Sequence, residues 1–142
     1  MMIKQLSLFV ENRPGALSAV CQVLKNNRIN IRTLSLADTQ QFGILRLLVK
    51  EYEKAKAALE AAGLVVKVTD VLALTVPDHP GGLADILTIF DKHRLSVEYM
   101  YAFTFGREDK SVMVFRFEHP EQAVELLKNE PIELVNSADL FR

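Results

Sequence analysis

The sequence of 142 residues lacks the features that define several protein classes. Its single cysteine, Cys21, excludes an internal disulfide, and no apolar run approaches the roughly 18 to 20 residues that a membrane-spanning helix needs. Lysine and arginine number 17 against 18 for aspartate and glutamate, so the net charge of −1 indicates no basic surface for nucleic acid or anionic lipid. With no cleavable apolar segment at the N-terminus, we expect a cytoplasmic protein whose partners include no nucleic acid and no membrane.

Motifs for catalysis or metal binding are also missing. The three histidines, His79, His93 and His119, stand apart, with no cysteine or carboxylate at a metal-ligand spacing. There is no glycine-rich phosphate loop, Ser/His/Asp order or paired-carboxylate motif. Cys21 falls on an apolar helical stripe, which is typical of a buried, unreactive thiol. We expect no metal, no cofactor and no catalytic residue.

A repeat with an offset of 66 residues organises the chain. Pro14-Gly15-x-Leu17 returns as Pro80-Gly81-x-Leu83, and the alignment holds without a gap over residues 6–34 and 72–100. Two copies in so short a chain indicate one folding unit written twice. Each unit of about 70 residues is near the lower limit of independent stability, so each half should be stabilised by contacts with the other.

Both copies show the same order of periodic patterns. Alternating apolar residues predict a strand at residues 6–10, and apolar residues three and four apart predict a helix at 17–24; the second copy repeats both patterns. The other predicted strands are residues 29–38, 42–50, 64–69, 95–105, 111–118 and 132–136, and the other predicted helices run from near Ala55 to Gly63 and from Pro120.

The order strand, helix, strand, strand, helix, strand is the split βαβ pattern. It predicts an α+β protein of two tandem ferredoxin-like βαββαβ domains, at residues 1–70 and 71–142, with both helices of each on one face of an antiparallel sheet. Almost no linker separates the copies. We therefore expect them to pack as a pseudo-twofold pair.

The repeated turn between the first strand and the first helix is the best candidate for a binding site. It runs over residues 11–17 in the first copy and 77–83 in the second. Asn12 and Asp78 can fold back through a side-chain oxygen, the proline presets φ, and glycine lets another group approach the backbone. Taken singly, each turn is better explained as a helix cap with no ligand, and duplication would copy a cap as well.

Free amide groups at the start of each helix would favour an anion. At residues 15–17 and 81–83 these N–H groups are expected to point outward from a helix N-terminus, where a carboxylate or phosphate binds well. A free amino acid fits this geometry, with its carboxylate on the amides and its ammonium group toward Asn12 or Asp78.

The two copies resemble ACT domains, the small regulatory βαββαβ modules that bind amino acids. The resemblance rests on the D/N-x-P-G-x-L turn at residues 12–17 and 78–83 and on the apolar start of the second strand at residues 29–31 and 95–97, and it covers the whole chain. It implies a non-catalytic amino-acid sensor that regulates a separate enzyme or transporter, and it is compatible with a homodimer.

The first copy resembles the serine-binding ACT domains of phosphoglycerate dehydrogenases, through Asn12 and Asn30. The second copy has Asp78 and Ser96 at the matching positions, so the ligand identity stays open. Family effectors sit where two ACT domains meet side by side, which implies two unequal sites, one with Asn12 and Ser96 and one with Asp78 and Asn30. The candidate ligand-binding residues are Asn12, Arg13, Pro14, Gly15, Ala16, Leu17, Asn30, Asp78, His79, Pro80, Gly81, Gly82, Leu83 and Ser96.

Two other functions are compatible with this fold. A small enzyme could use Arg13 to stabilise an anionic substrate, although no base or nucleophile stands near the turn. RNA binding through sheet aromatics would need a basic surface that the composition lacks.

Two side-chain patterns predict the faces of the sheets. The alternating residues Val97, Tyr99, Tyr101, Phe103 and Phe105 are expected to pack against the helices, with an aromatic ligand as the alternative. One arginine lies in the middle of the third strand of each copy, Arg46 in the first and Arg116 in the second. Both are expected on the opposite face of the sheet, which could also support dimerisation.

Overall fold

The computed structural model describes residues 2–37, 40–103 and 108–141. It divides into two compact units, an N-terminal module (Lys4–Thr69) and a C-terminal module (Asp70–Leu140 with the first residues of the chain). In chain order the elements are β1 (Ile3–Glu11), α1 (Ala16–Asn26), β2 (Ile31–Ala37), β3 (Phe42–Val49), α2 (Tyr52–Ala61), β4 (Lys67–Pro77), α3 (Gly82–Lys92), β5 (Tyr99–Ala102), β6 (Lys110–Arg116), α4 (Pro120–Leu127), β7 (Leu134–Val135) and α5 (Ser137–Leu140).

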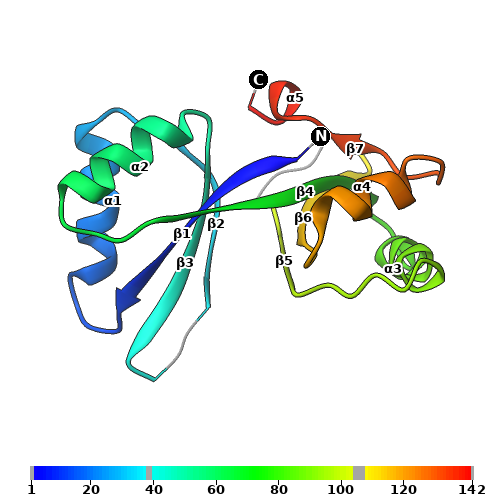
Figure 1. Cartoon of the computed structure of the whole chain (residues 1–142), viewed down its shortest axis with the longest axis horizontal. Helices are drawn as coiled ribbons and strands as arrows, with labels where there is room; N and C mark the ends of the chain where they lie inside the picture. Colours follow the sequence, from blue (N-terminus) through cyan, green and yellow to red (C-terminus); the bar gives the residue numbers. More distant parts are fainter. Residues whose placement is uncertain (1, 38–39, 104–107, 142) are drawn as a thin grey trace. The chain divides into compact units, whose positions relative to one another are not determined.

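The N-terminal module has the predicted split βαβ topology. Its strands are ordered β2-β3-β1-β4, and β3 runs antiparallel to both of its neighbours. β4 belongs to both modules, because it runs from Lys67 to Pro77 across the boundary between Thr69 and Asp70. Alternate residues of β1 and β3 face α1 and α2, which lie on the same side of these strands (Figure 1). The core they form includes Leu6, Leu8, Leu45 and Leu47 from the strands and Leu24 from α1.

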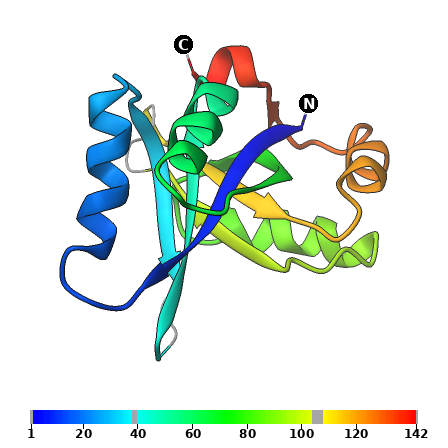
Figure 2. The ribbon, with the colours of Figure 1, turned by 60° about the vertical axis from the view of Figure 1, so that its left-hand side comes forward.

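The C-terminal module repeats this arrangement in the order β5-β6-β4-β7. Its core lies between these strands and the helices α3 and α4, which Figure 2 shows from a second direction. Phe90 of α3 meets Phe115 edge to face, with ring centroids 5.2 Å apart, and makes a similar contact with Phe117. The predicted fold, two ferredoxin-like βαββαβ units with helices on one face, is confirmed.

The predicted helix boundaries are also confirmed at two sites. α4 begins at Pro120, where a proline without an N–H donor is tolerated. α2 ends just before Gly63, which has φ of +90°. A short fifth helix, α5, was not predicted, because four residues are too few to show helical periodicity.

The second strand of the C-terminal module differs from the prediction. Residues 95–98 do not belong to β5, which covers only Tyr99–Ala102, and residues 104–107, with Phe105, lie outside the described part of the chain. Val97 and Met100 pack on the helix-side core, whereas the register pairs Tyr99 with Arg116 and Tyr101 with Val114 on the opposite face. The two tyrosines therefore do not pack against the helices as expected.

The reason is an interruption of the two-residue alternation. Val97 and Met100 are three residues apart and still share a face. In the N-terminal module the same offset separates Ile31 from Leu34, and a register shift between Ile31 and Thr33 accounts for it. An extra residue in one strand reverses the faces of all residues beyond it.

The arginines of the third strands lie where the sequence predicts them. Arg46 stands between Leu45 and Leu47, which belong to the helix-side core, so its side chain leaves the opposite face of the sheet. Arg116 lies between two core phenylalanines and is bonded to Glu98, with 3.2 Å between Nε and Oε1.

Candidate functional site

The turn that joins β1 to α1 is a type II β-turn over residues 13–16. Pro14 occupies its second position and Gly15 its third, with φ 91° and ψ −19°, and the Ala16 N–H donates to the Arg13 carbonyl at 3.2 Å. A type II turn needs positive φ at the third position, which glycine adopts without steric cost. The Pro-Gly pair thus explains the sharp change of direction from strand to helix.

The turn that joins β4 to α3 has the same conformation. Gly81 has φ 88° and ψ −9°, and the Gly82 N–H donates to the His79 carbonyl at 3.0 Å. A Cβ added at Gly15 or Gly81 would meet no atom within 4 Å. The backbone angle, rather than crowding, therefore requires glycine at both positions.

The expectation of three free amides in each turn is correct in part. Ala16 and Gly82 use their N–H groups to close the turns. Among the residues that the structure describes, no hydrogen bond engages the amides of Gly15 and Leu17, nor those of Gly81 and Leu83 at the start of α3. Two predicted donors therefore remain available in each turn.

The expectation that Asn12 and Asp78 cap the helices is wrong. The N-cap residues are the two turn glycines, and neither helix start has a side-chain cap. Instead, the backbone N–H of Asn12 donates to the Gln41 carbonyl at 2.8 Å, and that of Asp78 to the Asp109 carbonyl at 2.6 Å. Both side chains are exposed, so their oxygen atoms are free of a capping role.

The charged neighbours of the two turns differ. Arg13 forms an exposed ion pair with Glu11, with 2.6 Å between Nε and Oε2. In the other turn His79 occupies the matching position and contacts the Pro80 carbonyl through Nδ1 at 3.0 Å. α1 has no acidic residue in its first turn, whereas α3 has Asp85.

The backbone also differs at the first residue of each helix. Ala16 is half-buried, but Gly82 is buried so closely that an added Cβ would lie 1.9 Å from the Pro77 carbonyl oxygen. Leu17 and Leu83, one residue further on, pack partly on the core of their own module.

Asn30 and Ser96 lie at the opposite end of each module from the turn. In the N-terminal module Glu11 pairs with Phe42 and Ile31 with Val49, seven residues further along β3, which corresponds to about 23 Å. Asn30 immediately precedes Ile31. The register of β4, β5 and β6 separates Asp78 from Ser96 in the same way. A small ligand therefore cannot contact Asn12 and Asn30 of the same module at once, nor Asp78 and Ser96.

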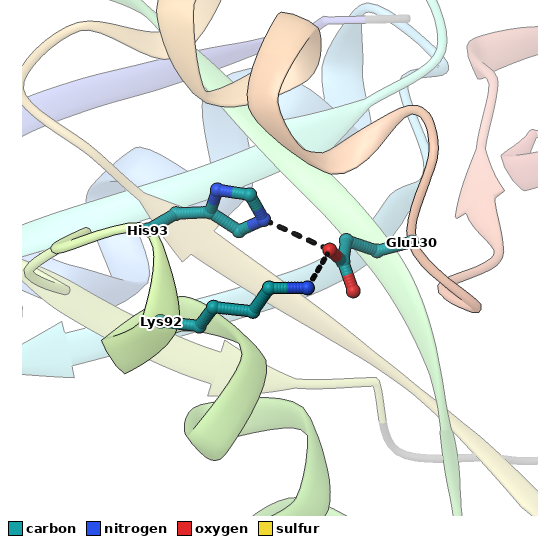
Figure 3. Close-up of polar contacts among 3 residues, drawn as sticks. All are labelled: Lys92, His93 and Glu130. Atoms are coloured by element: carbon teal, nitrogen blue, oxygen red, sulfur yellow. Dashed lines mark hydrogen bonds and ion pairs between the residues drawn. The ribbon is translucent and has the colours of Figure 1, made fainter.

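A polar cluster that the sequence analysis missed lies at this second end of the C-terminal module. Lys92 Nζ and His93 Nε2 both contact Glu130 Oε1, at 2.7 and 3.0 Å, and join the end of α3 to the segment after α4 (Figure 3). The hydrogen bonds from Lys92 and then His93 lower the pKa of Glu130 below its ordinary value of 4.5. Their separation of 37 and 38 residues in sequence gives no local signal of this contact.

The comparisons with known proteins agree with this geometry. The family described as "ACT domain pair" matches residues 1–142. The chain belongs to this family. ACT domain pairs are regulatory modules. A search of curated proteins gives no match.

Two solved structures show how far the likeness extends. Protein BT0572 from Bacteroides thetaiotaomicron is 35% identical, with 100% of this chain and 97% of that chain covered and a TM-score of 0.92. The ligand-free regulatory subunit of aspartate kinase from Thermus thermophilus is 15% identical, with coverage of 88% and 90% and a TM-score of 0.63. At that identity the second likeness shows the shared fold of an ACT domain pair.

Two searches of the described residues, 2–37, 40–103 and 108–141, found neither a metal-ligand group nor a spanning helix. No three His, Cys, Asp or Glu side chains in these ranges come together as metal ligands. None of the helices in the same ranges has the length and apolar character required to cross a bilayer.

A substitution in the second turn tests the tight approach at Gly82. We expect Gly82→Ala to lower the free energy of unfolding by about 3 kcal/mol, because the Pro77 carbonyl must move to admit the methyl group. Ala16→Gly, at the matching position of the first turn, should cost only about 0.5 to 1 kcal/mol. Urea unfolding measures both, and equal losses would contradict the difference between the turns.

The polar cluster predicts a pH-dependent contribution to stability. Because the pKa of Glu130 is lowered on folding, its carboxylate stabilises the folded state above the ordinary pKa, and this contribution is lost as the pH falls through the lowered value. Glu130→Gln should therefore unfold at lower urea than the wild type at pH 6, with the difference shrinking below about pH 4. Parallel pH profiles for the two proteins would argue against the contact.

A second carboxylate serves as the control for that measurement. Glu125 is exposed and pairs with Lys128 at 2.6 Å on the surface of α4. Glu125→Gln should change the unfolding midpoint little at any pH, because solvent-exposed ion pairs contribute little to stability.

Proposed function

We propose that the chain is a non-catalytic sensor of a free amino acid, which it binds at the strand-to-helix turns of its two modules. The observation that carries the proposal is the pair of type II turns, each with two amides that no hydrogen bond engages among the described residues, those of Gly15 and Leu17 and of Gly81 and Leu83. These donors and the positive end of the helix dipole favour a carboxylate. The candidate residues are those of residues 12–17 and 78–83, with Asn30 and Ser96.

The ammonium group of the ligand would bind the side-chain oxygen of Asn12 or Asp78. Both side chains are exposed and serve no capping role, so they are free to contact a ligand. A carboxylate at position 78 attracts a cation more strongly than the neutral amide at position 12. The two sites are therefore unequal in this proposal.

Each site would combine residues from two modules, because a turn and a strand start of one module are too far apart. If two modules meet side by side, one site pairs Asn12 with Ser96 and the other pairs Asp78 with Asn30. The modules that meet could belong to one chain or to two chains of a homodimer. The likeness of the first copy, through Asn12 and Asn30, to serine-binding ACT domains makes serine one of the ligands to test.

The output of such a sensor would pass to another protein. In this proposal the regulated activity, an enzyme or transporter of amino-acid metabolism in the cytoplasm, belongs to a separate chain. Ligand binding can shift an equilibrium between two states only by the difference in its affinity for them.

A thermal-shift screen of the twenty amino acids tests the proposal. A ligand present at about 100 times its dissociation constant stabilises the folded state by roughly 2.7 kcal/mol, which raises the melting temperature by about 5 to 10 °C for a chain of this length. We expect at least one amino acid to give such a shift. A flat response to all twenty, at concentrations up to about 10 mM, would contradict an amino-acid sensor.

Truncation of the two turn residues tests whether the sites are unequal. Asn12→Ala and Asp78→Ala should weaken binding of the amino acid found in the screen by different factors, since the carboxylate of Asp78 adds a charge–charge attraction to the ammonium group that the neutral amide of Asn12 lacks. Isothermal titration measures both, with Asn129→Ala, an exposed residue outside the turns, as the control. Identical losses would show that the sites are equivalent.

A further inference from the structure

Three helices of the protein end in the same hydrogen-bonded motif. After the last turn of α1, α2 and α3, one backbone N–H donates across five residues and the preceding N–H across three, which is the Schellman motif. The longer bonds are those from Ile29 to Leu24, from Leu64 to Leu59 and from Leu95 to Phe90, at 2.9, 3.1 and 2.9 Å.

The residue at the left-handed position of this motif differs among the three helices. At the end of α2 it is Gly63, with φ of +90°. At the ends of α1 and α3 it is Arg28, with φ of 58°, and Arg94, with φ of 56°. This conformation is sterically unfavourable for a residue with a Cβ, and glycine is the usual choice. Arginine thus occupies the strained position in both modules, 66 residues apart, although the same chain uses glycine at the third cap.

Neither guanidinium stabilises the fold through a polar contact. Both side chains are exposed, and within the described ranges no hydrogen bond or ion pair engages the guanidinium of Arg28 or of Arg94. The helix dipole does not require them either, because Lys25 and Lys92 already place a positive charge in the last turns of α1 and α3.

Acidic partners for the two arginines are missing or already engaged. No aspartate or glutamate occurs from Asn12 to Ala37, on either side of Arg28. Near Arg94, Glu130 accepts from Lys92 and His93 (Figure 3), and Glu98 pairs with Arg116. In the part of the chain that the structure describes, neither arginine thus has an ion-pair partner.

The position of the two arginines connects them to the candidate site. Arg28 stands two residues before Asn30, which directly precedes β2, and Arg94 stands two residues before Ser96, in the segment that leads into β5. A residue that is held in a strained backbone conformation, with no structural contact that explains it, is a candidate for a functional role.

We propose that Arg28 and Arg94 bind a carboxylate of the ligand at the two strand starts, an inference that rests on the proposed amino-acid sensor. The planar guanidinium can donate two parallel hydrogen bonds to one carboxylate. That carboxylate is either the α-carboxylate of the amino acid or a carboxylate of its side chain. The contribution of Arg28 is the larger, because the surrounding segment from Asn12 to Ala37 carries basic residues and no acidic one.

The test separates a binding role from a capping role by the direction of two effects. Arg28→Gly and Arg94→Gly remove the strain together with the charge, so the melting temperature should stay the same or rise by up to about 4 °C. Binding of the amino acid identified among the twenty should nevertheless weaken about 10-fold or more. Arg28→Lys and Arg94→Lys keep the charge and should retain part of the affinity.

Lys25→Ala provides a matched control. It removes one positive charge from the last turn of α1 without touching the left-handed position, and it should leave the affinity unchanged. The probes are the twenty amino acids and succinate, which has two carboxylates and no ammonium group, all measured by isothermal titration. If the glycine variants lose more affinity for glutamate than for glutamine, the arginines bind the side-chain carboxylate. If the two losses of affinity are equal, the arginines bind the α-carboxylate.

The outcomes distinguish this inference from the proposed function. If the glycine variants bind the amino acid as tightly as the wild type, the arginines have no role in binding and the sensor still stands. If only succinate binds, and binding is lost in the glycine variants, the arginines bind a carboxylate and the amino-acid sensor fails. If no probe binds the wild-type protein, both proposals are overturned.

Discussion

The candidate site depends on one constraint, the positive φ of Gly15 and Gly81. This angle lets a four-residue type II turn connect the end of a strand to the start of a helix. Since the space beside both glycines is open, any other residue would fit sterically but would strain the backbone. The short turn keeps the first amides of the helix next to the end of the strand, and these amides are the donors on which the proposed binding mode rests.

The sequence predicts most of the fold because the repeat and the periodic patterns are local. Alternation correctly assigns the core faces of β1, β3, β4 and β6, where pairing is regular. It fails in β2, where the register places Ile31 and Leu34 on one face, and around β5, where Val97 and Met100 pack on one core, although three residues separate the members of each pair. An extra residue in a strand leaves no mark on composition, so alternation alone placed the tyrosines of β5 on the wrong face.

The candidate site could be predicted less completely than the fold. The Pro-Gly pair reveals the turn, because proline and glycine have strict backbone preferences. The sequence does not reveal that the turn itself uses the amide of Ala16, since this bond depends on the exact backbone angles. It also hides the left-handed conformation of Arg28 and Arg94, because arginine rarely adopts it. The repeat aligns Arg28 with Arg94 in the sequence. Only the structure of the helix caps shows that both arginines adopt the left-handed conformation.

The two modules share a backbone and differ in charge. Both turns, both caps and both strand interruptions recur at equivalent positions, so the geometry of the proposed site is repeated along with the fold. The segment from Asn12 to Ala37 contains no acidic residue, whereas the matching part of the second module contains Asp78, Asp85, Asp91 and Glu98.

If both turns bind a ligand as proposed, a difference in preference between the modules would come from electrostatics and individual side chains rather than from backbone shape. If the two sites bind with different affinity, they fill at different ligand concentrations. The coupling free energy between the two sites then cannot exceed the difference in ligand-binding free energy between the conformational states of the protein.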